Sequence, residues 1–213
     1  MVTSETEIAC LALAALGGPE IVSIDDSGDS NARSARLHYA STRDEVLRRA
    51  KWPFAVKPAR LAKLSSPPIS KFSAQYAMPA DFIRFVEVNG SDVWSDEASD
   101  AQTRYAIEGG DDSMPNMLLI NDVGATVSIR YIRRVEDVTK FDALFVKAFV
   151  TLLASKMAGV VTGDLQVGKS FLAEFEQIAL PNARNVSAQE KGKNVLTPLM
   201  QQIRASGIHN ARR

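Results

Sequence analysis

The chain has 213 residues, of which 46% are hydrophobic and 23% charged, and its 25 basic and 25 acidic residues give a formal net charge of zero. This composition is typical of a globular protein with one substantial core or two small ones. A net charge of zero excludes a strong global attraction to nucleic acid or to a membrane surface. We expect neither a secretory signal nor an apolar run long enough to span a bilayer. The single cysteine, Cys10, cannot form an internal disulfide, which favours assembly in a reducing cytoplasm.

The charges are unevenly distributed along the chain. Residues 33–60 carry a net charge of +6, residues 81–112 carry −7, and residues 188–213 carry +4. Opposite charges on two segments of one chain suit head-to-tail contacts between copies, because a positive patch on one copy meets a negative patch on the next. The hypothetical subunit-interface residues are Arg43, Arg48, Arg49, Asp96 and Glu97.

Two helices are predicted in the first 51 residues. Ser4 and Glu7 form a capping-box pattern ahead of an apolar stretch that the Gly17–Gly18–Pro19 sequence ends. Asp29 or Ser30 is expected to cap a second helix that runs to about Lys51. Its expected inner residues are Ala32, Ala35, Tyr39, Val46, Leu47 and Ala50, and its expected outer residues are Arg33, Arg36, Arg43, Arg48 and Arg49.

Strand patterns follow the helix-breaking Trp52–Pro53–Phe54 sequence. Strands are predicted within residues 55–64, 82–88, 104–108, 117–120 and 125–132. The alternation slips at Val86, which indicates a bulge, and Asn89–Gly90 is a turn dipeptide. The close spacing and short turns favour an antiparallel meander. Six acidic residues are expected in its loops: Asp92, Asp96, Glu97, Asp100, Asp111 and Asp112.

Residues 139–179 are predicted to form two amphipathic helices packed against each other. Thr139 is expected to cap the first helix, and Gly163 is expected to end it. Asp164 is a suitable cap for the second helix, which Pro181 is expected to stop or kink.

Residues 163–170 also match the phosphate-binding pattern GxxxxGK[ST]. In such a loop, backbone amides cradle phosphates, Lys169 reaches the outer phosphates and Ser170 holds magnesium. A true phosphate loop follows a buried strand, whereas the residues before Gly163 have helical periodicity. We therefore favour a turn between two helices and keep a small P-loop nucleotide-binding protein as an alternative.

The last residues form a polar segment with a short amphipathic stretch. Its apolar residues could dock on a partner while its basic residues steer the approach. The candidate docking residues are Leu196, Leu199, Met200, Ile203, Arg204, Arg212 and Arg213.

Several short motifs follow one another along the chain, and their order is informative. The series consists of Ala14–Ala15–Leu16–Gly17, Ile24–Asp25–Asp26, Leu37–His38–Tyr39, Arg43–Asp44, Leu47–Arg48, Trp52–Pro53–Phe54–Ala55, Tyr76, Met78–Pro79–Ala80–Asp81–Phe82 with Arg84, Tyr131–Ile132, Phe141–Asp142–Ala143–Leu144–Phe145, Leu152–Leu153–Ala154 and Gly163. Over roughly residues 5–190, the chain resembles the head-to-tail adaptor family of short-tailed bacteriophages, the tail tubular protein A group.

This resemblance implies an α+β fold, a four-helix bundle with an inserted antiparallel β-domain and an extended C-terminal tail. The implied helical bundle comprises residues 1–52 and 138–190, the β-domain residues 53–137, and the tail residues 191–213. Members form a ring, commonly of twelve copies, under the portal protein at the head–tail junction of the virion.

The implied role is structural, with no catalytic site, cofactor or metal. The ring extends the channel for double-stranded DNA, supports a tail nozzle or tail tube protein, and is assembled in the host cytoplasm without a membrane. The tail residues named above would engage the portal. Another ring or stopper protein of a phage neck is the remaining alternative.

Overall fold

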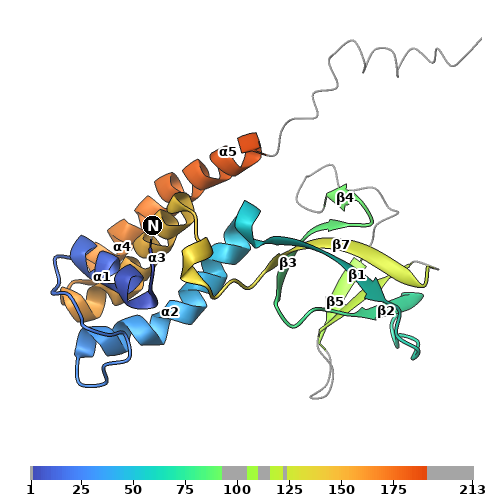
Figure 1. The fold of residues 1–213 in the computed structure, drawn as a ribbon, viewed down its shortest axis with the longest axis horizontal. Coiled ribbons are helices and arrows are strands. Elements are labelled where there is room, and N and C mark those ends of the chain that lie inside the picture. The colour runs from blue at the N-terminus through green and yellow to red at the C-terminus, as the bar shows by residue number, and fades with distance from the viewer. Residues whose placement is uncertain (1, 93–104, 110–115, 122–123, 191–213) are drawn as a thin grey trace, which may run out of the picture.

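The structure, a computed structural model, describes residues 2–92, 105–109, 116–121 and 124–190. Within these residues the fold is mixed α and β. Helices precede and follow a set of strands that form two small antiparallel sheets (Figure 1). The predicted α+β class is therefore confirmed at this level.

The two N-terminal helices begin at the predicted residues. Helix α1 spans Glu5–Ala15, and the Ser4 hydroxyl accepts a hydrogen bond from the Glu7 amide at 3.1 Å. Helix α2 spans Ser30–Arg49, and the Asp29 carboxylate accepts hydrogen bonds from two backbone amides of its first turn. Side-chain oxygens thus satisfy amides that a helix leaves unpaired at its start.

The third helix begins later than predicted. Helix α3 spans Ala143–Val161, and its N-cap is Asp142, whose carboxylate accepts a backbone N–H at 2.7 Å. Thr139 lies in a separate 3-10 turn, η3 (Val138–Lys140), and donates its hydroxyl to Asp137 at 2.6 Å. The prediction that Thr139 caps this helix is wrong, because its hydroxyl is used by the preceding turn.

The last helical segment continues through Pro181. Helix α4 (Leu165–Glu174) leads into a π-helical turn, η4 (Phe175–Ala179), and then into α5 (Leu180–Glu190). Of the two predicted outcomes at Pro181, a stop or a kink, the stop is therefore wrong. A proline ring clashes with the carbonyl four residues earlier, and here that carbonyl lies inside the wider π turn, which gives the ring room.

The strands pair in an order that their spacing did not predict. One sheet has the order β1-β7-β3-β4 and the other has the order β2-β6-β5, all with antiparallel neighbours. The bounds are β1 Val56–Ala62, β2 Ala74–Ala77, β3 Phe82–Val88, β4 Ser91–Asp92, β5 Tyr105–Glu108, β6 Met117–Ile120 and β7 Thr126–Arg133. The antiparallel prediction is confirmed, but the meander is wrong, because β1 pairs with the last strand instead of the next one.

The predicted bulge and turn in the β3 region are present. The pairing of β3 with β7 shifts register between Phe82 and Arg84 and again between Phe85 and Glu87. The adjacent residues Phe85 and Val86 are both buried, because they point to opposite faces of β3 and each face lies against a different core. Asn89 and Gly90 have φ values of 48° and 82°, so both residues of the turn after β3 have positive φ.

A large aromatic cluster joins the helices to the first strand. Trp52 is fully buried, its indole N–H donates to the Val46 carbonyl at 2.8 Å, and its ring packs edge-on against Phe145 at 5.0 Å. Phe54 packs against Phe145 and Phe141 in the same cluster. This cluster fixes the point at which the chain leaves α2 and enters β1.

Helix α3 is the central helix of this core. It has the length and apolar composition of a membrane-crossing helix, which the sequence reading did not expect. Half of that apolar stretch is buried against the rest of the fold, and α1, α2 and α4 all contact α3. A soluble core helix passes the same test of length and composition, so we interpret α3 as the core helix of this fold.

Candidate functional site

The segment that matches the phosphate-loop pattern forms a tight turn and a helix. Gly163 has a left-handed φ of 70° after the C-cap of α3, and the Asp164 carboxylate caps α4 by accepting the Gln166 amide at 2.7 Å. Lys169 and Ser170 lie inside α4, and the Ser170 hydroxyl donates to the Val167 carbonyl at 2.7 Å. The segment follows a helix and has no extended loop around which amides could cradle a phosphate, so nothing in its geometry favours nucleotide binding.

Gly168 has a packing role in this motif. A Cβ atom added at Gly168 would lie 2.7 Å from the backbone oxygen of Ser155 and 3.3 Å from the Cβ of Ala158, both in α3. Only a residue without a side chain lets α3 and α4 approach this closely. The glycine of the apparent motif is therefore explained by helix packing.

Arg43 is buried, contrary to the prediction that it lies on the outer side of α2. Its side chain is 7% exposed, its Nε donates to the Asp44 carboxylate at 3.0 Å, and its guanidinium lies 3.7 Å from Glu136. Arg43 lies four residues after Tyr39 and three before Val46, so helical periodicity agrees with its burial, and nearby carboxylates allow the charge to be buried. These partners belong to the same chain.

Arg48 and Arg49 hold the end of α2 against other elements. Arg48 donates to the Ile83 carbonyl in β3 at 2.9 Å. Arg49 lies 3.0 Å from Glu176 and 3.5 Å from Glu45, and over the ring of Phe175. Both arginines therefore make contacts within this chain.

Two further arginines cap the carbonyls that end α2. Arg84 donates to the Arg48 carbonyl at 3.2 Å, and Arg184 donates to the Arg49 carbonyl at 2.8 Å and 3.1 Å. Cations are favoured at a helix C-terminus because the helix dipole is negative there. Burial and the neighbouring Arg48 and Arg184 charges lower the pKa of Arg84.

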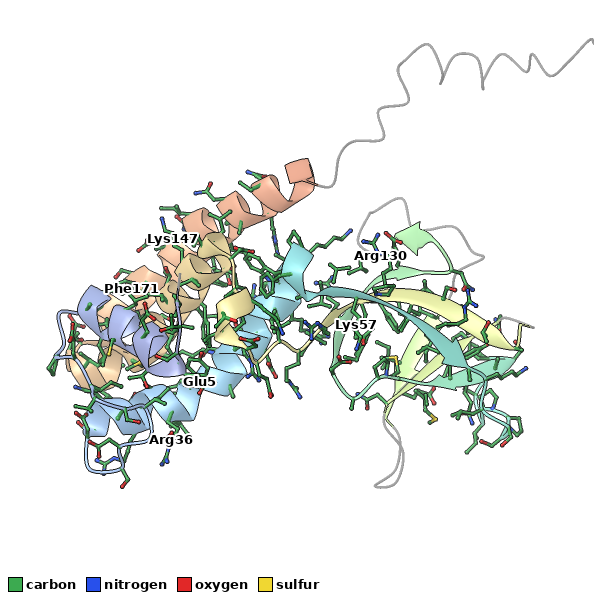
Figure 2. All side chains as sticks on the ribbon, viewed as in Figure 1. Glu5, Arg36, Lys57, Arg130, Lys147 and Phe171 are labelled. Carbon is green, nitrogen blue, oxygen red and sulfur yellow. The ribbon has the colours of Figure 1, made fainter. Side chains whose placement is uncertain are left out.

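Asp81 forms a polar contact between strands β1 and β7. Its carboxylate accepts hydrogen bonds from the Tyr131 hydroxyl at 2.7 Å and from the Lys57 ammonium at 3.2 Å. Figure 2 shows Lys57 between the helices and the sheets. Burial opposes ionisation of Asp81, but these two hydrogen bonds outweigh burial and lower its pKa. Burial and the neighbouring Asp81 raise the pKa of Tyr131.

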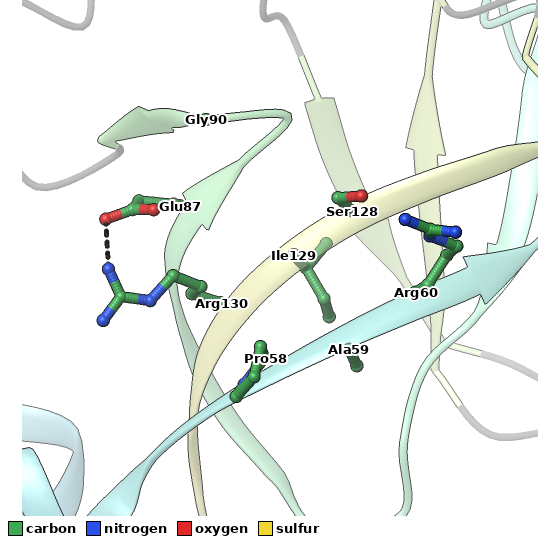
Figure 3. Close-up of a pocket in the computed structure, with 8 residues that line it drawn as sticks. All are labelled: Pro58, Ala59, Arg60, Glu87, Gly90, Ser128, Ile129 and Arg130. Atoms are coloured by element: carbon green, nitrogen blue, oxygen red, sulfur yellow. Dashed lines mark hydrogen bonds and ion pairs between the residues drawn. The ribbon is translucent and has the colours of Figure 1, made fainter.

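A shallow pocket of about 530 Å³ lies on the open face of the β1-β7-β3-β4 sheet. Glu87 and Arg130 form an ion pair at 2.8 Å on one side of it, and Arg60 lies on the other side near Ser128 (Figure 3). The remaining lining residues are Pro58, Ala59, Gly90 and Ile129. The pocket is broad and shallow, which suits a protein surface better than an enclosed small molecule.

A larger groove of about 700 Å³ lies between α2 and α4, and we call it the α2–α4 groove. Its floor is α3, and its walls are the end of α2 and the exposed face of α4. The lining residues are Glu45, Arg49, Leu152, Ser155, Lys156, Gly159, Val160, Leu165, Gly168, Lys169, Leu172 and Glu176. The sequence analysis missed this groove, because the pattern of α4 alone does not show that Leu165 and Leu172 stay exposed beside α2.

The other predicted site residues all lie outside the described part of the chain. These are Asp96 and Glu97 of the hypothetical subunit interface and the tail residues Leu196, Leu199, Met200, Ile203, Arg204, Arg212 and Arg213. In the part of the chain that the structure describes, no group of three or more His, Cys, Asp or Glu side chains is arranged to hold a metal ion.

No protein-family model matches this chain, and no curated protein matches its sequence significantly.

Proposed function

We propose that this chain is a structural virion protein, a head-to-tail adaptor that forms a ring between the portal and the tail nozzle or tail tube. The observation that carries the proposal is the placement of an antiparallel β region between helices that pack together. Helices α1 and α2 precede the strands, α3 and α4 follow them, and α3 contacts the other three. This arrangement supports the fold that the sequence resemblance implies.

We also propose how the chain divides into domains. We treat α1, α2, α3 and the α4–α5 run as a four-helix bundle formed by residues 1–52 and 138–190. Residues 53–137 are then an inserted β-domain, and residues 191–213 are a tail. In this reading the strands are a module carried on the bundle, and the tail is the part that reaches the portal.

The charge distribution suits a channel through which DNA passes. Each phosphate that a protein neutralises strengthens DNA binding, so a densely basic channel would hold the DNA back. The formal net charge is zero. Several basic side chains in the described region are paired with carboxylates, such as Lys156 with Glu45 at 2.8 Å and Arg134 with Asp44 at 2.8 Å. The proposed role is transit of DNA, and it requires no catalytic residue or cofactor.

Negative-stain electron microscopy tests the proposal directly. The purified chain is imaged alone and after mixing with portal rings encoded by the same genome. A ring of this protein stacked on the portal supports the adaptor role, and deletion of residues 191–213 is then expected to abolish the stacking. A ring that binds only another neck component supports a stopper or neck-ring role, and failure to join any of these complexes rejects the proposal.

Charge reversal tests the hypothetical contacts between copies. Reversal of Arg48 and Arg49 to Glu is expected to weaken ring formation and its dependence on salt. Because both arginines also hold α2 in place within the subunit, the folded state of the variant is checked by circular dichroism. Arg36→Glu is the matched control, since Arg36 is an exposed residue of α2 in the same basic segment (Figure 2). Unchanged assembly in a folded double variant would reject the contact.

A further inference from the structure

The α2–α4 groove brings several exposed apolar side chains together. Val160, Leu165 and Leu172 are 56%, 72% and 43% exposed, and all three line this groove. Leu152 of its floor is buried. Apolar side chains that gather in one concave region, with charged residues at the rim, are characteristic of a protein-binding surface.

The rim of the groove has one cation more than it has carboxylates. Glu45 is paired with Lys156 at 2.8 Å, and Glu176 is paired with Arg49 at 3.0 Å. Lys169 is exposed in the same rim and has no carboxylate partner among the described residues. A partner that brings its own carboxylates to an apolar anchor is therefore complementary to this surface.

The chain itself contains a segment with that chemistry. Residues 91–103 have four carboxylates and no lysine or arginine. Val93 and Trp94 stand together in this segment, ahead of Asp96 and Glu97. Tryptophan is the residue type most often found at the energetic centre of a protein interface, where it fills an apolar pocket.

We propose that the α2–α4 groove is a docking site for residues 93–100 of a second copy of this chain. Trp94 occupies the apolar part of the groove, between Leu165 and Leu172, and Asp96 or Glu97 pairs with Lys169. A groove on one copy that receives a different surface of the next copy is a heterologous contact, the kind that closes into a ring. The inference rests on the proposed function, because it states how the copies of the ring meet.

A peptide binding experiment tests the complementarity. The probe is a synthetic peptide of residues 91–103 with a fluorophore, and its anisotropy is measured against the full-length chain. We expect saturable binding that falls about tenfold with Lys169→Glu, the loss expected for a close charge pair. Leu165→Ala and a peptide with Trp94→Ala are also expected to bind more weakly.

The matched control is Lys147→Glu. Lys147 is an exposed lysine of α3 outside the groove (Figure 2), so its reversal makes the same change in net charge and is expected to leave peptide binding unchanged. An equal loss with both charge reversals, or no binding by the parent chain, would overturn the proposal. The Trp94→Ala peptide is tested against the unchanged chain, so this comparison holds even where a chain variant does not fold.

Cysteine cross-linking tests whether the occupant comes from a second copy. Cys10→Ala removes the natural thiol, and Ser95→Cys and Val160→Cys are placed in two chains that carry different tags. A disulfide-linked pair with both tags is expected on mixing. When both cysteines are placed in one chain, a disulfide that forms only within that chain would overturn the proposal, as would the absence of any cross-link.

Failure of the groove inference can be distinguished from failure of the adaptor proposal. If the chain stacks on the portal while groove variants assemble normally, the groove inference is wrong and the adaptor role stands. If copies cross-link through the groove but never join the portal or another neck component, the adaptor role is wrong and the groove contact stands.

Discussion

The helical region and the β region of this chain are built by different kinds of contact. Helices α1, α2 and α4 each begin after a predicted cap residue next to them in the sequence, namely Ser4, Asp29 and Asp164. The sheets instead depend on partners far apart, such as Val56 opposite Ile132. Local rules therefore specify most helix ends, whereas the strand order depends on the packing of the whole fold.

The two regions are nevertheless joined at two strands. Phe85 and Tyr131 belong to the core between the sheets, whereas the next residues, Val86 and Ile132, belong to the core formed with the helices. Adjacent residues of a strand point to opposite faces, so β3 and β7 each contribute side chains to both cores. We therefore expect a loss in the helical core to reach the sheets through β3 and β7.

The largest effect is expected for Trp52→Ala. It removes a fully buried ring and the hydrogen bond to the Val46 carbonyl, at an expected cost of about 3–5 kcal/mol of the free energy of unfolding. Urea unfolding by circular dichroism measures the loss, and hydrogen exchange locates it. If only the helices lose protection from exchange, the two regions are less coupled than the shared strands indicate.

Trp52→Phe is the matched control for this substitution. It retains an aromatic ring beside Phe145 and removes the indole N–H, so the Val46 carbonyl loses its partner. We expect a smaller loss than for Trp52→Ala. An equal loss would mean that the hydrogen bond, and not the packing of the ring, dominates the contribution of Trp52.

The next largest effect is expected for Gly168→Ala, which tests helix packing without touching the sheets. The new Cβ would lie 2.7 Å from a backbone oxygen of α3, so the helices must separate. We expect a loss of about 1–3 kcal/mol, measured by urea unfolding. Gly159→Ala is the control, because its Cβ would meet only the flexible end of Leu165 at 3.1 Å. A loss for Gly159→Ala as large as that for Gly168→Ala would contradict this explanation.

The sequence predicted the helical part better than the strand order because of the range of the contacts. The buried side of α2, the bulge at Val86 and the turn at Asn89 follow from patterns a few residues long. The pairing of β1 with β7 is not encoded in spacing, since it joins residues about 70 positions apart. Arg43 was misplaced although its spacing from Tyr39 and Val46 fits the buried side, because an arginine is rarely buried without a partner and one of its partners, Glu136, lies far along the chain.

The candidate site was predictable only in part. The charged segments and the tail could be read from composition, since they are properties of single stretches. The α2–α4 groove could not be predicted from the sequence. It forms because Glu45 and Arg49 of α2 lie opposite Leu165 and Leu172 of α4. A pattern within one helix shows that Leu165 is apolar, but it does not show that the neighbouring helix leaves that residue exposed.

A smaller effect is expected at the start of α3, where the cap is Asp142 and not the predicted Thr139. Asp142→Ala removes the carboxylate that accepts the Phe145 amide, at an expected cost of about 1 kcal/mol. Thr139→Ala, the matched comparison, removes a hydroxyl that serves only the preceding turn, and we expect a smaller loss. Thermal unfolding of both variants decides between them, and a greater loss for Thr139→Ala would restore the original prediction.

The smallest effect is expected for Tyr131→Phe, in the β region. It removes the hydrogen bond to Asp81, whose side chain is 32% exposed and therefore partly screened by solvent, so we expect a loss of about 0.5–1 kcal/mol at pH 7. Because the pKa of Asp81 is lower in the folded than in the unfolded chain, its carboxylate stabilises the fold above the unfolded pKa of about 4. That stabilisation is lost as the pH falls through the folded pKa. The difference between parent and variant in urea unfolding is therefore expected to shrink below about pH 4, and a difference that stays constant from pH 7 to pH 3 would show that Tyr131 acts through packing alone.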